Sequence, residues 1–437
     1  MQVKDKFKRI RQMLKHEDFC TYIGKVKRIS GMMVEATGSK YKIGEICQIN
    51  TDVAGKTIPA EVVGFNDGQV LLMPYEDIKG IGLGNTVTST NNKLKIPVGD
   101  FLIGRIVDAT GQPIDDGEKF TSNEYCYVDN EYINPLSRPR INETLSFGVK
   151  AIDGLLTIGK GQRMGIFAGS GVGKSTLLGM VAKNVKADIN VIALVGERGR
   201  EVREFIEKDL GEEGLKRSVL VIATSDQPAM LRVKCALTAT TIAEYFKDKG
   251  KDVLLMMDSL TRFAMAQREI GLATGEPPVS RGYTPSIYAE LPKLLERSGN
   301  FAQGSITGIY TVLVEGDDTN EPISDTVRGI VDGHIVLTRK LANSNHYPAI
   351  DINGSISRLM TDIAGEEHNE KAKKIRDILA EYYANYDLIS IGAYKKGTNP
   401  KLDEAIKKID KVNSFLKQGI NEKYTFDEII DLMDEII

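Results

Sequence analysis

The chain has 437 residues, a length typical of two or three domains, and 41% of them are hydrophobic, which is enough to build their cores. Its 57 basic and 60 acidic residues give a net charge of -3, so no overall positive field would attract nucleic acid. The four cysteines lie far apart and form no CxxC pair, which argues against a zinc site and against a disulfide framework.

The first twenty residues predict an amphipathic helix. Phe7, Ile10, Met13 and Leu14 fall on one helical face, and lysines and arginines surround them. A solvated terminal helix is the usual meaning of this pattern. We expect neither a signal peptide nor a membrane span, because the segment has no apolar centre and the sequence has no run of 18 apolar residues.

Residues 21–92 predict a small antiparallel β-barrel. Short runs rich in β-branched residues alternate there with Gly, Asn and Asp, which is typical of many short strands joined by turns. Few aromatic residues interrupt these runs and no basic stripe follows them, so a structural role is favoured over oligonucleotide binding. The expected strands lie at 22–29, 44–49, 60–63 and 69–73.

Residues 93–362 predict an α/β domain and residues 363–437 a helical one. Near-continuous apolar strands alternate with helical stretches in the first, which indicates a parallel sheet covered on both faces. Ile375, Ile378, Leu379 and Tyr382 repeat with helical spacing in the second. The expected strands of the sheet lie at 165–168, 190–195, 219–223, 253–257, 309–314 and 334–337.

A phosphate-binding loop follows the first of these strands. The run from Gly169 to Thr176 reads Gly-Ser-Gly-Val-Gly-Lys-Ser-Thr, preceded by Ala168 where the usual pattern has glycine. Backbone N–H groups of such a loop, together with a helix N-terminus, bind polyphosphate. Lys174 is expected to reach the β- and γ-phosphates of ATP and the Ser175 hydroxyl to ligate Mg²⁺.

Two carboxylates are expected at the edge of the sheet where ligands bind. Asp258 ends the strand 253–257, where it suits a metal-organising acid, although such a residue is as often a helix N-cap. Glu197 follows the strand 190–195 and suits a general base for the attacking water. Its alternative is an exposed ion-pair cluster in the run 197–203, and the residues alone do not separate these two interpretations.

Six runs of sequence resemble the ATPases of type III protein export, in particular their flagellum-specific branch. These enzymes are similar to the catalytic subunits of rotary ATP synthases. The resemblance extends from about Tyr22 to Asp410. It implies an N-terminal antiparallel β-barrel, a RecA-like P-loop NTPase core, a C-terminal helical domain and a six-membered ring. The runs lie at 161–175, 195–205, 258–271, 275–278, 288–297 and 351–358.

The resemblance also implies roles for individual residues. Lys174 and Ser175 contact phosphate and Mg²⁺, Glu197 is the catalytic carboxylate, and Asp258 organises the metal. A glutamate at position 197 distinguishes these enzymes from non-catalytic rotary subunits, which carry glutamine there. The remaining expectations come from the same motifs: loop residues Gly169, Ser170, Gly171, Val172, Gly173 and Thr176 bind nucleotide, Tyr347 stacks on adenine, Arg198 and Arg262 lie near the γ-phosphate, and Arg358 is an arginine finger given to a neighbouring subunit.

The resemblance further implies partners and a place in the cell. We expect a homohexamer whose N-terminal segment (residues 1–20) docks a stator-like regulator, with the export gate, a central stalk protein and chaperone–substrate complexes as further partners. We expect no nucleic acid. The expected location is the bacterial cytoplasm, at the inner face of the membrane, where acidic phospholipid is a second candidate partner. An injectisome ATPase, a RecA-like nucleic-acid translocase and a non-hydrolysing rotary subunit are the alternatives.

Overall fold

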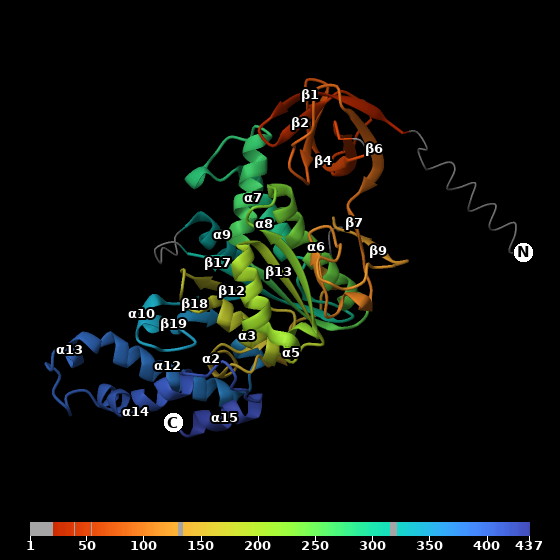
Figure 1. The fold of residues 1–437 in the computed structure, drawn as a ribbon. Helices are drawn as coiled ribbons and strands as arrows, with labels where there is room; N and C mark the ends of the chain where they lie inside the picture. Colours follow the sequence, from red (N-terminus) through yellow and green to blue (C-terminus); the bar gives the residue numbers. More distant parts are fainter. Residues whose placement is uncertain (1–20, 39, 54, 130–133, 315–320) are drawn as a thin grey trace, which may run out of the picture. The chain divides into compact units, whose positions relative to one another are not determined.

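A computed structural model describes residues 21–38, 40–53, 55–129, 134–314 and 321–437. The predicted N-terminal helix at 1–20 therefore lies outside the described residues. The chain divides into two compact units, which are described separately: residues 1–94 with 270–276, and residues 95–269 with 277–437. Figure 1 follows the chain through both units. No helix in the described ranges is long and apolar enough to cross a membrane.

The first unit contains the predicted β-barrel, in which every strand pairs antiparallel with its neighbours (Figure 1). Alternate side chains point inward, so Val34, Ile49 and Leu72 are completely buried. Asp67 and Gly68 form a two-residue hairpin, in which both residues have positive φ. In barrel order the strands are β1 (Ile23–Ser30), β2 (Met33–Ala36), β5 (Gln69–Pro74), β4 (Thr57–Asn66), β3 (Glu45–Asn50) and β6 (Thr86–Lys93).

The second unit is built around a sheet to which nine described strands belong. The central strands are parallel, as predicted, and their apolar residues are buried on both faces. The edge strand after Pro348 is antiparallel, which the predicted parallel pattern did not include. In sheet order the strands are β19 (Ile350–Ser357), β18 (Gly333–Leu337), β12 (Arg163–Ala168), β17 (Ser305–Leu313), β15 (Asp252–Asp258), β13 (Ile189–Glu197), β14 (Ser218–Thr224) and β8 (Ile106–Asp108); β16 (Gly299–Asn300) pairs with β17.

Helices connect the central parallel strands, because parallel neighbours need a crossover connection. The longest, α6, packs against β13, β14 and β15. The helices before the C-terminal region are α2 (Lys150–Leu155), α3 (Lys174–Asn184), α4 (Gly199–Glu204), α5 (Gly211–Leu215), α6 (Ala229–Asp248), α7 (Leu260–Ala273), α8 (Pro285–Leu295), α9 (Pro322–Ile330) and α10 (Arg339–Asn343). The shorter elements are η1 (Asp100–Leu102), η2 (Pro135–Ser137), the π-helical turn η3 (Phe205–Leu210), η4 (Ser280–Gly282), and the strand pairs β7 (Lys95–Pro97) with β9 (Tyr125–Tyr127) and β10 (Thr144–Leu145) with β11 (Ile158–Gly159).

The C-terminal region is helical, as predicted. Its helices continue the apolar core of the sheet, because Ile375, Val412 and Ile429 belong to the same buried cluster as Ile166 and Leu178. Pro at the first helical position begins α14, and a capping box between Thr425 and Glu428 begins α15. The helices are α11 (Met360–Ile363), α12 (Glu366–Ala384), α13 (Tyr386–Ser390), α14 (Pro400–Leu416) and α15 (Phe426–Asp434). Figure 1 labels α12 to α15 in the blue part of the chain.

Candidate functional site

The predicted phosphate loop joins β12 to α3. Gly171 and Gly173 have φ of 78° and 89°, a left-handed backbone that favours glycine. Val172 is buried at 1% exposure and fixes the middle of the loop to the core, while Ser170 and Ser175 are exposed. The N-terminus of α3 therefore presents its N–H groups beside an open surface, which is a suitable site for phosphate oxygens.

Lys174 joins the two predicted carboxylates in one cluster. Its Nζ lies 2.5 Å from Asp258 Oδ1 and 3.7 Å from Glu197 Oε1. Burial alone would lower the pKa of the Lys174 ammonium, but the negative charges of Asp258 and Glu197 outweigh burial and raise this pKa. The lysine is therefore a permanent cation at the base of the phosphate loop.

Asp258 ends β15 at the predicted edge and is buried, with 5% of its surface exposed. The Thr311 hydroxyl donates a 2.7 Å hydrogen bond to the same Oδ1 that contacts Lys174. Thr311 lies in β17, between the strand that carries the loop and the strand that carries Asp258. These two donors fix the orientation of the carboxylate.

Glu197 ends β13, where the register with β14 is shifted by a bulge. It is 8% exposed, and among the described residues no donor hydrogen-bonds to its Oε1. Burial is the main cause of a pKa well above the usual value for a glutamate; the charge of Asp258 adds to the increase and Lys174 opposes it. An acceptor that is buried, unbonded and readily protonated suits a base that takes a proton from water.

The exposed ion-pair cluster also exists, beside this site. Arg198 Nη1 lies 3.2 Å from Glu201 Oε1, and Arg203 Nε lies 2.7 Å from Glu207 Oε1, with all four side chains largely exposed. Glu197 is buried and pairs with Lys174 instead. The structure places Arg198 in this surface pair, directly after Glu197, and its role near the γ-phosphate stays a prediction.

Arg262 faces Glu197 from the first turn of α7. A Cβ added to Gly196 would lie 3.1 Å from Arg262 Cβ, so Gly196 allows the two segments to approach closely. The positive charge of Arg262 opposes the raised pKa of Glu197. Within the described part of the chain, the buried Nε of Arg262 has no hydrogen-bond acceptor. Arg262 can therefore contact an anionic group that enters beside Glu197.

Tyr347 lies against the phosphate loop. A Cβ added to Gly173 would lie 3.4 Å from Tyr347 Cδ1 and Cε1, and the ring is 42% exposed. Its carbonyl oxygen accepts a 3.0 Å hydrogen bond from the N–H of Gln418, which holds the segment between α10 and β19 in place. An open aromatic ring beside the loop can stack on a planar base.

Arg358 lies at the opposite ends of the strands from the phosphate loop. Ser357 pairs with Gly333 at the beginning of β18, which is parallel to β12. Across the sheet, Gly333 is level with Met164 of β12. At about 3.3 Å per residue, β12 runs about 16 Å from Met164 to Gly169, where the phosphate loop begins. Arg358 is exposed, and its Nη2 donates a 3.3 Å hydrogen bond to Arg328 O. The structure does not bring Arg358 to the Lys174 cluster of the same chain.

Comparisons with known proteins show the family of the chain. The nucleotide-binding domain model of the ATP synthase alpha/beta family matches residues 148–357, and the β-barrel domain model of that family matches residues 26–91. The model of the T3SS EscN ATPase C-terminal domain matches residues 364–435. The flagellum-specific ATP synthase of Bacillus subtilis (strain 168) is 57% identical over 410 residues, which cover 93% of each chain. The chain belongs to the ATP synthase alpha/beta family.

Other relatives place it among the ATPases of flagellar and type III secretion systems. The type 3 secretion system ATPase of Xanthomonas euvesicatoria is 46% identical, with 94% of this chain and 93% of that protein covered. The structure of assembled EscN from enteropathogenic E. coli matches with a TM-score of 0.90 and 46% identity, over 94% of this chain and 99% of that chain. The family resemblance and the three-part fold predicted from the sequence are thereby confirmed.

In this member of the family, sequence reasoning missed two residues that support the expected site. Thr311 hydrogen-bonds to Asp258, and Gln162 contacts the strand end that carries Arg358. A polar residue inside an apolar strand was the available signal for Thr311. No signal identified the partner of Gln162, because Ser357 is 195 residues away in sequence.

The described residues fit a nucleotide with its metal ion. They contain no group of three or more His, Cys, Asp or Glu side chains that could hold a metal by themselves. Mg²⁺ usually binds through one or two carboxylates together with substrate phosphates, and Asp258 and the exposed Ser175 hydroxyl fit that mode. The unbonded Glu197 Oε1 and Arg262 Nε leave an acceptor and a donor for the water and the phosphate.

Proposed function

We propose that this chain hydrolyses ATP with Mg²⁺ in a homohexameric ring and that hydrolysis drives the export of flagellar proteins through a type III apparatus. The observation that carries the proposal is the cluster of Lys174, Asp258 and Glu197 at the base of the phosphate loop. It joins a phosphate-binding cation, a metal-organising acid and a base in one buried site.

Each residue then has a separate task. The N–H groups of residues 169–174 and the Lys174 ammonium hold the phosphates, and Tyr347 holds the base. Mg²⁺, held by Ser175 and Asp258, would neutralise charge on the phosphate oxygens. Glu197 orients the attacking water and accepts its proton, which its raised pKa favours near neutral pH. Arg262 lies beside Glu197 and contacts the γ-phosphate.

Arg358 completes the site of a neighbouring subunit in this proposal. Arg358 is exposed. Along the strand direction, the neighbouring Ser357 lies about 16 Å from the beginning of the phosphate loop of its own chain. Head-to-tail contacts around a ring bring opposite edges of adjacent subunits together. An arginine supplied in this way stabilises charge on the transferring phosphoryl group and is worth about 10³ to 10⁵ in turnover.

Partners are proposed on the same basis. Solved structures show the related EscN assembled, and also in complex with its central stalk EscO. We propose an equivalent ring and stalk here, with a stator-like regulator at residues 1–20, and the export gate and chaperone–substrate complexes as further partners. The cytoplasmic face of the bacterial membrane is the proposed location. Export through a flagellum is favoured over an injectisome because the flagellum-specific relatives of Bacillus subtilis and Treponema pallidum are 57% and 50% identical, and the type 3 secretion system ATPase of Xanthomonas euvesicatoria 46%.

The substitution Glu197→Gln tests the chemistry. The amide has the same size but cannot accept a proton, so we expect ATP binding without turnover. Binding is measured by equilibrium titration with ATP and Mg²⁺, and turnover by phosphate release. Glu207→Gln is the matched control, because Glu207 is an exposed carboxylate that pairs with Arg203 at 2.7 Å, and it should keep near-normal turnover. Wild-type turnover in Glu197→Gln would show that Glu197 is not the base.

A further inference from the structure

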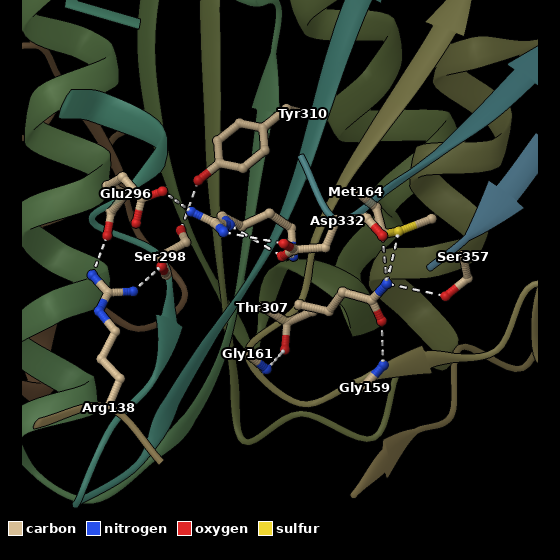
Figure 2. A network of polar contacts seen from close by, with 12 residues as sticks. Arg138, Gly159, Gly161, Met164, Glu296, Ser298, Thr307, Tyr310, Asp332 and Ser357 are labelled. Carbon is tan, nitrogen blue, oxygen red and sulfur yellow. Dashed lines mark hydrogen bonds and ion pairs between the residues drawn. The ribbon is translucent and has the colours of Figure 1, made fainter. Parts of the chain in front are cut away.

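A network of polar contacts holds the strand end that carries Arg358 (Figure 2). Gln162 is completely buried immediately before β12. Its Nε2 donates hydrogen bonds to Ser357 Oγ at 3.0 Å and to Asp332 O at 3.3 Å, and its Oε1 accepts one from the Gly159 N–H at 2.8 Å. The side chain of Gln162 therefore reaches past the beginning of β18 to the end of β19.

Asp332 connects the same network to the backbone of Arg358. The Arg358 N–H donates a 3.0 Å hydrogen bond to Asp332 O, which is also the acceptor for Gln162. The Asp332 carboxylate is held by Arg163, whose Nε and Nη2 each lie 3.1 Å from one of its oxygens. Ser357 in turn donates a 2.7 Å hydrogen bond to Thr157 O. Figure 2 labels Asp332 and Ser357 within this network.

These contacts matter because β19 lies at the edge of the sheet and has only β18 as a described neighbour. A strand end with one neighbour is fixed by few backbone hydrogen bonds, so its position depends on side chains. Arg358 itself is exposed, and a long arginine magnifies any displacement of its backbone. A group that must meet a transferring phosphoryl group loses about 10²-fold in rate when it is misplaced by about 1 Å.

We propose that Gln162 is a positioning residue for Arg358, and that it acts on the active site of the neighbouring subunit by fixing the backbone at Ser357 and Arg358. This inference rests on the proposed role of Arg358 across the subunit interface. Gln162 also precedes the strand that ends in the phosphate loop of its own chain, so β12 supports one site at each of its ends.

The substitution Gln162→Glu tests the proposal with a side chain of equal size that cannot donate to Ser357 or Asp332. We expect turnover at saturating ATP to fall by about tenfold to 10²-fold, while the KM for ATP stays within about twofold, since the phosphate loop and Tyr347 are unchanged. Subunits of Gln162→Glu mixed with Glu197→Gln subunits should regain turnover, because a Glu197→Gln subunit still supplies an intact Arg358 to its neighbour.

Asn190→Asp is the matched control. Asn190 is a completely buried amide at the beginning of β13, just as Gln162 immediately precedes β12. Its Nδ2 donates hydrogen bonds to Ala182 O and Ser218 Oγ, and β13 lies several strands away from β19. Damage to folding would lower turnover in this variant too, but mixing with Glu197→Gln subunits would not restore it.

Mixing experiments with Gln162→Glu and Arg358→Ala distinguish the role of Gln162 from the role of Arg358. Rescue of Arg358→Ala by mixing, without rescue of Gln162→Glu, would overturn the role of Gln162 alone. Absence of rescue for both variants would overturn the role of Arg358 across the interface. If Gln162→Glu does not assemble, Ser357→Ala removes the same hydrogen bond from the other side. That variant should show a smaller loss with the same rescue, and wild-type turnover would refute the proposal.

Discussion

The substitution Lys174→Met should destabilise the protein in a pH-dependent manner, even without nucleotide. Lys174 neutralises two buried carboxylates, and Met replaces it with an apolar chain of similar length. Breaking a buried ion pair by removing one partner costs about 3–5 kcal/mol, because the remaining charge stays buried. Thr311 and Arg262 still face the carboxylates, so we expect a cost near the lower end of that range at pH 8.

The sign of the pH dependence follows from Glu197. Burial and Asp258 already raise its pKa, and loss of the Lys174 charge raises it further. An acid whose folded pKa lies above its unfolded value binds more protons in the folded state, so stability falls as pH rises from the unfolded pKa to the folded one. The variant should therefore approach wild-type stability near pH 5 and differ most near pH 8.

Thermal unfolding of both proteins between pH 5 and pH 8, without ATP, measures this difference. At about 2–4 °C per kcal/mol for domains of ordinary size, the melting temperature should fall by several degrees at pH 8 and by much less at pH 5. Lys208→Met is the control, since Lys208 pairs at 3.8 Å with the exposed Glu204 and its loss should cost under about 1 kcal/mol. An equal deficit at both pH values, or none, would refute the assignment of a buried, charge-compensated cluster.

Two further predictions concern the metal site and the N-terminal segment. Thr311→Val keeps the shape of the side chain but removes a donor to Asp258. A hydrogen bond to a charged group contributes about 1.5–3 kcal/mol, so the Mg²⁺ concentration for half-maximal turnover should change by about tenfold or more. An unchanged Mg²⁺ titration would contradict the role of Thr311. Deletion of the first 15 residues should preserve turnover and melting temperature, since termini usually tolerate truncation. It should abolish binding of the export regulator in a pull-down. Unchanged binding, or a melting temperature lowered by many degrees, would rule out a docking helix.

Local patterns in the sequence predicted that Lys174, Glu197 and Asp258 lie close together, but did not by themselves separate a base at Glu197 from an exposed ion pair. Glycines fixed the position of the phosphate loop, and the C-terminal ends of parallel strands meet at one edge of a sheet, which brought Glu197 and Asp258 to Lys174. Short runs of β-branched residues predicted four of the six barrel strands but not β2 and β6, and near-continuous apolar runs predicted most strands of the sheet. These features depend on neighbouring residues or on general topology, so they can be inferred without coordinates.

The surroundings of the site depended on contacts between distant segments. Thr311 and Gln162 acquire their roles from partners 53 and 195 residues away. Arg198 follows Glu197 in sequence, yet its extended backbone at the beginning of α4 leaves it paired with Glu201 at the surface. The antiparallel direction of β19, which carries Arg358 to the opposite edge of the sheet, could not be read from the composition of that strand.

Turnover of mixed rings tests the central claim, an ATPase site shared between two subunits, most directly. Arg358→Ala subunits keep Lys174, Glu197 and Asp258, while Glu197→Gln subunits keep Arg358, so each should be almost inactive alone. In a random equal mixture, about one head-to-tail interface in four joins an intact loop to an intact arginine. The account predicts turnover approaching a quarter of the wild-type rate; turnover equal to the mean of the two parent variants would contradict it.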